Sequence, residues 1–182
     1  MTARALITLL AGAALAAATQ KPLVSRAALA ALEKNFDQRI YQRFGVDDPM
    51  DLLGTTRGVY LDGFGALFTA ELSLVLAPTI TPFRPTISKD QAARLRERKL
   101  ARLPALKQTM LDMMVTSAAN LKEVPLEEQI VVGVSLQYYS WEDTAGLPGQ
   151  ILMQAQRKTL VGFESGRLTR AQLDAAVRVS EF

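Results

Sequence analysis

Residues 57–77, RGVYLDGFGALFTAELSLVLA, constrain the fold more than any other stretch of the chain. After Gly65 the side chains alternate between an apolar set and a mixed set, which is the period of a strand with one face in the core. The apolar set is Ala66, Phe68, Ala70, Leu72, Leu74 and Leu76. Asp62 and Gly63 precede this run, and an Asp-Gly pair supplies the positive φ angles that hairpin turns need. The stretch therefore predicts a β-hairpin.

The register of this hairpin depends on the length of its loop. If the loop spans residues 62–65, Arg57 lies opposite Ala70 on the paired strand. Glu71 is then one residue out of register and points to the other face of the sheet. We therefore expect Arg57 and Glu71 not to form a site together.

The composition excludes several classes of function. The length of 182 residues favours one domain, and 49% apolar with 21% charged residues is ordinary for a globular protein. The net charge is only +3, so nucleic acid is not expected as a partner. Because the chain has no Cys and no His, a disulfide, a thiolate nucleophile, a Ser-His pair and the usual kind of zinc site are excluded. No motif for a cofactor or a metal is present, so none is expected.

Residues 1–18 have the layout of a secretory signal peptide. Arg4 gives a positive start, an apolar run extends over residues 5–18, and small residues stand before the expected cleavage site. The run is shorter than the roughly 20 residues of a spanning helix. We therefore expect residues 19–182 to form one exported domain, periplasmic or secreted, with no transmembrane segment in the mature chain. An uncleaved anchor in the inner membrane is the alternative.

Apolar residues at spacings of three and four predict an N-terminal helix and a long central helix. The first covers residues 24–44, with Ser25 as its cap. The second covers residues 89–120 and begins with a capping box at Ser88. We expect this helix to be interrupted or kinked at Pro104.

Two further strands and a last helix complete the pattern. Residues 129–139 alternate and are rich in β-branched side chains, which predicts a central strand. Residues 150–160 also alternate, and we expect a strand there, although their Gln, Met, Ala, Arg and Lys residues favour helix. A capping box at Thr169 opens a helix over residues 170–179.

An acidic stretch, residues 47–54, lies between the first helix and the hairpin. Its three carboxylates would suit a hard cation, but the spacing does not match a calcium loop. Asp48 before Pro49, with Gly54 closing the stretch, is instead typical of a capped helical turn.

The order of elements is helix, two strands, long helix, two strands, helix. An antiparallel sheet of about four to five strands, with the three helices segregated around it, is the economical arrangement, so the fold class is α+β. This order resembles the profilin-like and roadblock-like layouts, in which helices flank a sheet built from hairpins. The resemblance is one of topology, and a fold does not give a function.

Two loops carry residues suited to contact a ligand or partner. Trp141 stands beside Glu142 and Asp143, and an aromatic platform with two acids suits a sugar or a cationic ligand. The simpler interpretation is a solvated loop around a packed Trp. Phe83 and Arg84 lie in a proline-rich connection, which is either a contact surface or a connector laid across the molecule.

The first half of the central helix is basic between residues 94 and 107. Arg94, Arg98 and Arg102 are spaced by four and share a face, which would suit an anionic surface. Because the charges spread around the helix and no aromatic residue interleaves with them, a solvated face is favoured.

Two functions from different classes fit these patterns. The first is an exported, non-catalytic binding or scaffold domain of the bacterial envelope, with another envelope protein as its partner. It is favoured because the usual catalytic side chains are missing. The second is a hydrolase or lyase that uses carboxylates such as Glu142 and Asp143, which requires paired acids in a pocket. Anionic-surface binding through residues 94–107 is a further alternative.

Overall fold

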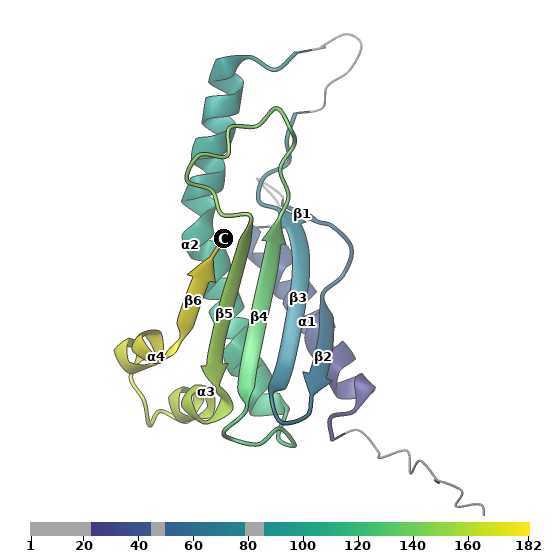
Figure 1. Cartoon of the computed structure of the whole chain (residues 1–182), viewed down its shortest axis with the longest axis vertical. Helices are drawn as coiled ribbons and strands as arrows, with labels where there is room; N and C mark the ends of the chain where they lie inside the picture. The colour runs from purple at the N-terminus through teal and green to yellow at the C-terminus, as the bar shows by residue number, and fades with distance from the viewer. Residues whose placement is uncertain (1–22, 45–49, 79–85) are drawn as a thin grey trace, which may run out of the picture.

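The computed structural model describes residues 23–44, 50–78 and 86–182, which form four helices and six strands (Figure 1). The helices are α1 (Arg26–Phe44), α2 (Lys89–Asn120), α3 (Arg157–Glu164) and α4 (Arg170–Ala176). The strands are β1 (Asp51–Leu52), β2 (Arg57–Leu61), β3 (Gly65–Ser73), β4 (Gln129–Leu136), β5 (Gln150–Gln156) and β6 (Arg178–Glu181). The expected signal peptide, Asp48, Phe83 and Arg84 lie outside the described residues.

The strands form one mixed sheet in the order β1-β3-β4-β5-β6, with β2 also paired to β3. Every pair is antiparallel except β3 and β4, which run parallel. These two are parallel because α2 connects them, and a helix returns the chain to the end of the sheet where β3 began. The class is therefore α+β, as the sequence predicts, with a mostly antiparallel sheet and one parallel pair.

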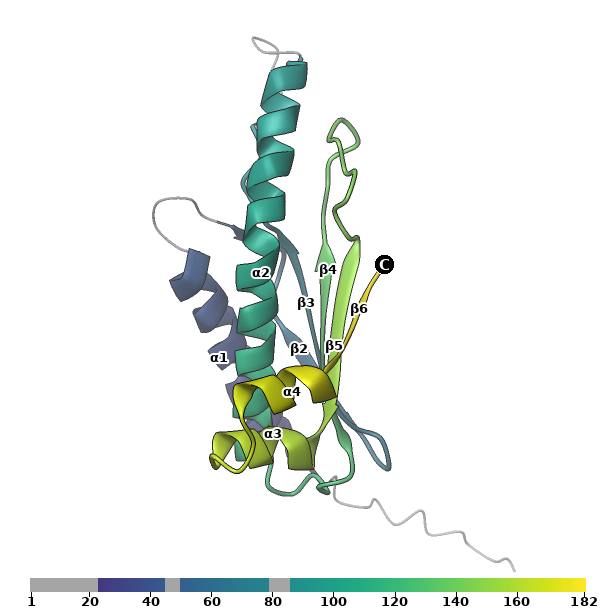
Figure 2. The same ribbon diagram turned by 90° about the vertical axis from the view of Figure 1, so that its left-hand side faces the viewer.

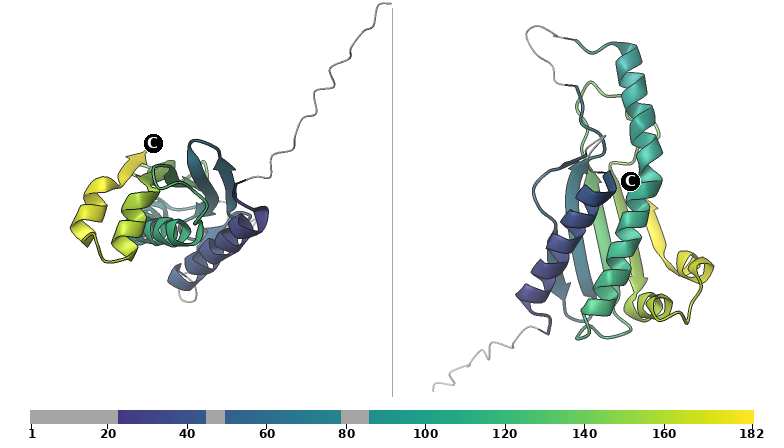
Figure 3. Two further views of the ribbon diagram at one scale, coloured as in Figure 1. Left: turned by 90° about the horizontal axis from the view of Figure 1, so that it is seen from below. Right: turned by 180° about the vertical axis from the view of Figure 1, so that it is seen from behind.

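In the described parts of the chain all four helices lie on one side of this sheet, and no helix covers the other side (Figure 2). Seen from behind, α1 and α2 run along the covered face while α3 and α4 lie near the lower ends of β5 and β6 (Figure 3). The core lies between the two layers, where Phe68, Leu72 and Val132 of the sheet are fully buried. Phe36 of α1 and Leu106 of α2 are fully buried against them.

The hairpin turn forms where Asp-Gly predicts it. Gly63 has a φ of 74°, and the N–H of Phe64 donates to the carbonyl of Leu61 at 3.0 Å. Gly65 follows with a φ of 134° and already belongs to β3. A Cβ at Gly65 would lie 1.9 Å from the carbonyl oxygen of Gln129, so this glycine is required by the close approach of β4.

The loop is therefore shorter than expected, and the register moves by one residue. Arg57 pairs with Thr69, so the predicted pairing of Arg57 with Ala70 is wrong. Arg57 and Glu71 consequently lie on the same, uncovered face of the sheet. Glu71 accepts a hydrogen bond there from the side-chain amide of Gln137.

The helix starts agree with the sequence to within two residues, and α2 has the predicted bounds but is not interrupted at Pro104. Ser88 and Thr169 form the predicted capping boxes, and Ser25 accepts from the N–H of Ala28 at 3.2 Å. The helical assignment of α2 continues through Pro104. Pro104 is exposed, so the carbonyl that loses its helical donor one turn earlier lies on the solvent side.

Three segments differ from their predicted structure. The ambiguous residues 150–160 contain both candidates, because β5 ends at Gln156 and α3 begins at Arg157. The last helix ends at Ala176, since Arg178–Glu181 pair with β5 as β6. Asp51–Leu52 pairs with β3, so the helical turn predicted over residues 47–54 is wrong for these two residues.

Candidate functional site

Two of the candidate sites in the sequence contact each other in the structure. Residues 137–149 connect β4 to β5 and extend beyond the strands, beside the first half of α2 (Figure 1). This loop, which we call the β4–β5 loop, carries the predicted Trp141, Glu142 and Asp143. Arg96 and Lys99 of α2 contact it.

Lys99 and Glu142 form a buried ion pair in this contact. The Nζ of Lys99 donates to Oε2 of Glu142 at 2.5 Å, and the two side chains are 0% and 2% exposed. The other carboxylate oxygen accepts from the N–H of Tyr139 at 3.1 Å. Because desolvating each charge costs several kcal/mol, the pair persists only with these compensating bonds. The predicted solvated face is therefore wrong at Lys99, and the predicted solvated loop is wrong at Glu142.

One aromatic ring contacts this ion pair, and two others, close in the sequence of the same loop, stack on each other. The Nζ of Lys99 lies 4.8 Å from the ring centroid of Tyr138, a cation–π distance. Burial, with a smaller contribution from the charge of Glu142, raises the pKa of the Tyr138 hydroxyl to about 12. The rings of Tyr139 and Trp141 stack with centroids 5.8 Å apart. Trp141 is half-buried against the core, as the packed-Trp interpretation predicts.

Asp143 is held by the same helix, but at the surface. The Nε of Arg96 donates to the carbonyl of Ala145 at 2.6 Å and lies 3.7 Å from Oδ2 of Asp143. A pair this exposed contributes between zero and about 1 kcal/mol. Both acids of the candidate site are thus engaged by cations of α2.

The three arginines that share a helix face have different surroundings. Arg102 donates to the carbonyl of Leu74 at 2.5 Å, and its guanidinium lies 5.8 Å from the ring centroid of Phe44. Arg94 and Arg98 line a shallow hollow of about 340 Å³ beside residues 76–78. Arg102 is therefore a packing residue, whereas the other two border a surface hollow.

The uncovered face of the sheet is a surface that the described helices leave free. The pairing places Val59, Leu67, Val131, Gln154 and Arg178 in one row across it, from β2 to β6. A neighbouring row reads Arg57, Thr69, Gly133, Leu152 and Ser180. The two central strands, β4 and β5, therefore contribute no charged side chain to this face.

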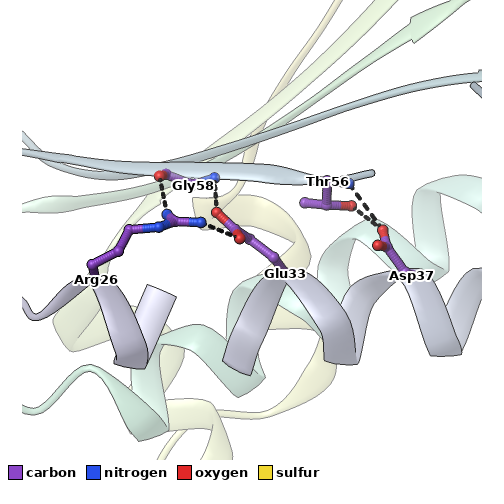
Figure 4. A network of polar contacts seen from close by, with 5 residues as sticks. All are labelled: Arg26, Glu33, Asp37, Thr56 and Gly58. Carbon is purple, nitrogen blue, oxygen red and sulfur yellow. Dashed lines mark hydrogen bonds and ion pairs between the residues drawn. The ribbon is translucent and has the colours of Figure 1, made fainter. Parts of the chain in front are cut away.

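Side chains of α1 form hydrogen bonds with backbone groups at one edge of the sheet (Figure 4). Oε1 of Glu33 accepts from the N–H of Gly58 at 2.6 Å, and Arg26 donates to the carbonyl of Gly58 at 3.0 Å. Oδ1 of Asp37 accepts from the N–H of Thr56 at 3.0 Å and from its hydroxyl at 2.5 Å. We call these contacts the α1 clamp.

The spacing of the α1 clamp follows from backbone geometry. Four residues of helix advance about 6 Å and two residues of strand advance roughly 6.6 Å, so Glu33 and Asp37 match Gly58 and Thr56. Burial acts to raise the pKa of Glu33, but the bonds from Arg26 and Gly58 and the charges of Arg26 and Arg57 outweigh it and hold the pKa below its usual value. The clamp therefore binds an ionised carboxylate.

Sequence reasoning missed the α1 clamp and the partner of Lys99. The signal for the clamp was two acids four residues apart beside the apolar stripe of α1, together with Gly58 in a strand. For Lys99 no local signal distinguishes it from its exposed neighbours, since its partner lies 43 positions away.

A second tyrosine has a strongly shifted pKa at the other end of the sheet. Burial, followed by the hydrogen bond and charge of Glu128 and by the influence of Asp62, raises the pKa of Tyr60 to about 12. The Tyr60 hydroxyl donates to Glu128 at 3.3 Å. Within the described ranges, no group of three acidic side chains lies close enough together to hold a metal ion.

Comparisons with protein-family models, curated proteins and solved structures find no match for this chain. None of the helices in the described parts of the chain is both long and apolar enough to cross a membrane.

Proposed function

We propose that this chain is an exported, non-catalytic binding domain of the bacterial envelope, and that the uncovered face of its sheet binds another envelope protein. The observation that carries the proposal is the placement of all four helices on one side of the sheet. A sheet needs a second apolar layer on one face only, so the opposite face is available for a partner.

The chemistry of the uncovered face favours a folded protein as the occupant. Val59 and Leu61 are 45% and 46% exposed there, beside the partly exposed Leu67 and Leu152. The charges on this face lie on the outer strands at Arg57 and Arg178 and near the end of β3 at Glu71. Depletion of charge at the centre with polar residues around it is the composition of a protein interface, whereas an anionic polymer or lipid surface would require clustered cations.

The engagement of the loop acids also favours binding over catalysis. A carboxylate-based hydrolase needs two acids that face a substrate. Here Glu142 is buried in an ion pair with Lys99, and Asp143 is paired with Arg96. The anionic-surface alternative is weakened in the same way, because Arg96, Lys99, Arg102 and Lys107 all make contacts within the chain.

Site-specific photo-cross-linking in the native host tests the binding face. A photo-reactive residue at Leu152 should give one discrete adduct, whereas the same residue at Ala101, exposed on α2, should give none. Leu61→Glu should reduce the Leu152 adduct by about tenfold or more, and Tyr41→Glu, an exposed apolar position on α1, should not. Equal adducts from both faces, or none from Leu152, would contradict the proposal.

Export has a separate test. The N-terminal sequence of the protein recovered from the periplasm or medium should begin at or near Thr19. Recovery of a chain that still begins at Met1 in the membrane fraction would show that the leader is an anchor.

A further inference from the structure

The two outer edges of the sheet are built differently. On the β2 side, the α1 clamp occupies the outward N–H and carbonyl groups of Gly58 and the N–H of Thr56. These groups of Gly58 and Thr56 are therefore not free to pair with another strand, which hinders strand addition at this edge. The opposite edge is β6.

The backbone of β6 presents unpaired groups to the outside. The N–H of Phe182 donates to Gln150 at 3.0 Å, and the N–H of Gln150 donates back at 3.2 Å. Because antiparallel pairing alternates, Ser180 also faces β5, and the N–H and carbonyl groups of Val179 and Glu181 point outward. In Figure 2, which looks onto this edge, no described segment lies in front of β6.

The protection of this edge is limited to its short length of four residues and to the charges of Arg178 and Glu181. Val179 and Phe182 are 45% and 71% exposed, and β6 contains no Pro. The outward N–H and carbonyl groups of Val179 and Glu181 are spaced by about 6.6 Å along the strand. This spacing is complementary to the backbone of another extended strand. The occupant is therefore an extended strand.

We propose that this strand is β6 of a second copy of the chain, paired antiparallel about a two-fold axis through Ser180. In that register Val179 lies opposite Glu181 of the second copy, and each such pair exchanges two hydrogen bonds. Arg178 lies opposite Phe182 of the second copy, where an exposed cation and a ring attract each other. No like charges stand opposite one another, so the strand is complementary to itself.

The α1 clamp explains why association stops at two copies. Pairing through one edge would continue into a fibre if the other edge were also open. With the β2 edge occupied by α1, β6 pairing closes after one step. The uncovered faces of the two sheets then form one continuous surface.

The first test is the oligomeric state of the purified exported protein. Four main-chain bonds and little buried area predict a weak dimer, so sedimentation should shift from monomer toward dimer between about 10 and about 300 μM. Val179→Pro removes an outward N–H without removing a bond to β5, and it should remain monomeric. Val179→Thr keeps the N–H and should still dimerise. Wild-type protein that stays monomeric throughout this range overturns the proposal.

A cysteine cross-link keeps the proposal testable if Val179→Pro fails to fold. The chain has no Cys, so Ser180→Cys introduces a single thiol. Residues at the two-fold axis form a non-hydrogen-bonded pair with Cα atoms about 4.5 Å apart, within reach of a disulfide. Ser180→Cys should form disulfide-linked dimers at least about tenfold faster than Ser165→Cys, an exposed control in the loop after α3. Equal rates would place the contact elsewhere.

Discussion

Gly58 lies where a strand, a helix and a core ring meet. A Cβ at this position would lie 2.7 and 2.8 Å from two carbons of the Phe68 ring and 3.3 Å from Oε1 of Glu33. Gly58→Ala should therefore lower the free energy of unfolding by about 1–3 kcal/mol, the usual effect of overpacking. Denaturant titration measures it.

Gly133→Ala is the matched control for this substitution. Its Cβ would lie 3.4 Å from Leu152 and 3.8 Å from Thr69, which are ordinary contacts. Because alanine also restricts the unfolded chain, the stability should be unchanged or higher by up to about 1 kcal/mol. Equal losses at both positions would show that strand glycines, rather than the contact with Phe68, determine the result.

The ion pair of Lys99 and Glu142 should behave as one unit. Lys99→Met or Glu142→Gln alone leaves a buried group without its partner and should cost about 3–5 kcal/mol. The double substitution leaves no unpaired charge, so its loss should be smaller than the sum of the two single losses. A double-mutant cycle from urea unfolding measures the difference, and strictly additive losses would mean that the side chains do not interact.

Arg102 and Arg94 share a helix face but should differ in effect. Arg102→Gln removes a charged donor from the carbonyl of the buried Leu74 and should lower the free energy of unfolding by about 1.5 kcal/mol. Arg94 is exposed, and Arg94→Gln preserves helix propensity, so that variant should match the wild type. Thermal and urea unfolding of both variants provide the comparison, and equal stability of the two would remove the packing role of Arg102.

At the scale of elements, patterns confined to one segment predicted well. Caps at Ser25, Ser88 and Thr169 and the turn at Gly63 depend on neighbouring residues, and each was correct. The register of β2 was wrong because Gly65 is required by β4, a strand more than 60 positions later. Side-chain alternation indicates which face is buried and leaves the neighbouring strand undetermined.

The candidate site shows the same division. Trp141, Glu142, Asp143 and the basic half of α2 were identified as unusual, but their mutual contact depends on the path of the β4–β5 loop. An acid or a cation in isolation predicts solvent exposure, since burial is favourable only with a partner. The sequence does not specify which partner the fold supplies.

The α1 clamp makes part of the stability dependent on pH. The pKa of Glu33 is lower in the folded chain than in the unfolded chain, so ionised Glu33 stabilises the fold above its ordinary pKa of about 4.5. This contribution is lost as the pH falls through the folded-state pKa. Glu33→Gln should therefore be less stable than the wild type at pH 7, and the difference should shrink below about pH 4.5. Urea unfolding at pH 7, 5, 4 and 3 measures it, and a difference that does not change with pH would contradict the ionised clamp.

For the whole molecule, the distribution of charge predicts weak interaction with anionic membranes. Among the contacts between described residues, Arg96, Lys99, Arg102 and Lys107 of the basic stretch between positions 94 and 107 each donate to an acid or a carbonyl of the chain. Each cation near an anionic membrane contributes roughly 1 kcal/mol to the free energy of binding. Arg94 and Arg98 together would therefore contribute only about 2 kcal/mol, even if both contacted lipid headgroups. The folded protein should therefore not co-sediment with phosphatidylserine vesicles at physiological ionic strength. Co-sedimentation that weakens with salt and disappears in an Arg94→Gln/Arg98→Gln variant would instead make the first half of α2 the binding surface, because salt screening and charge removal both act on an electrostatic contact.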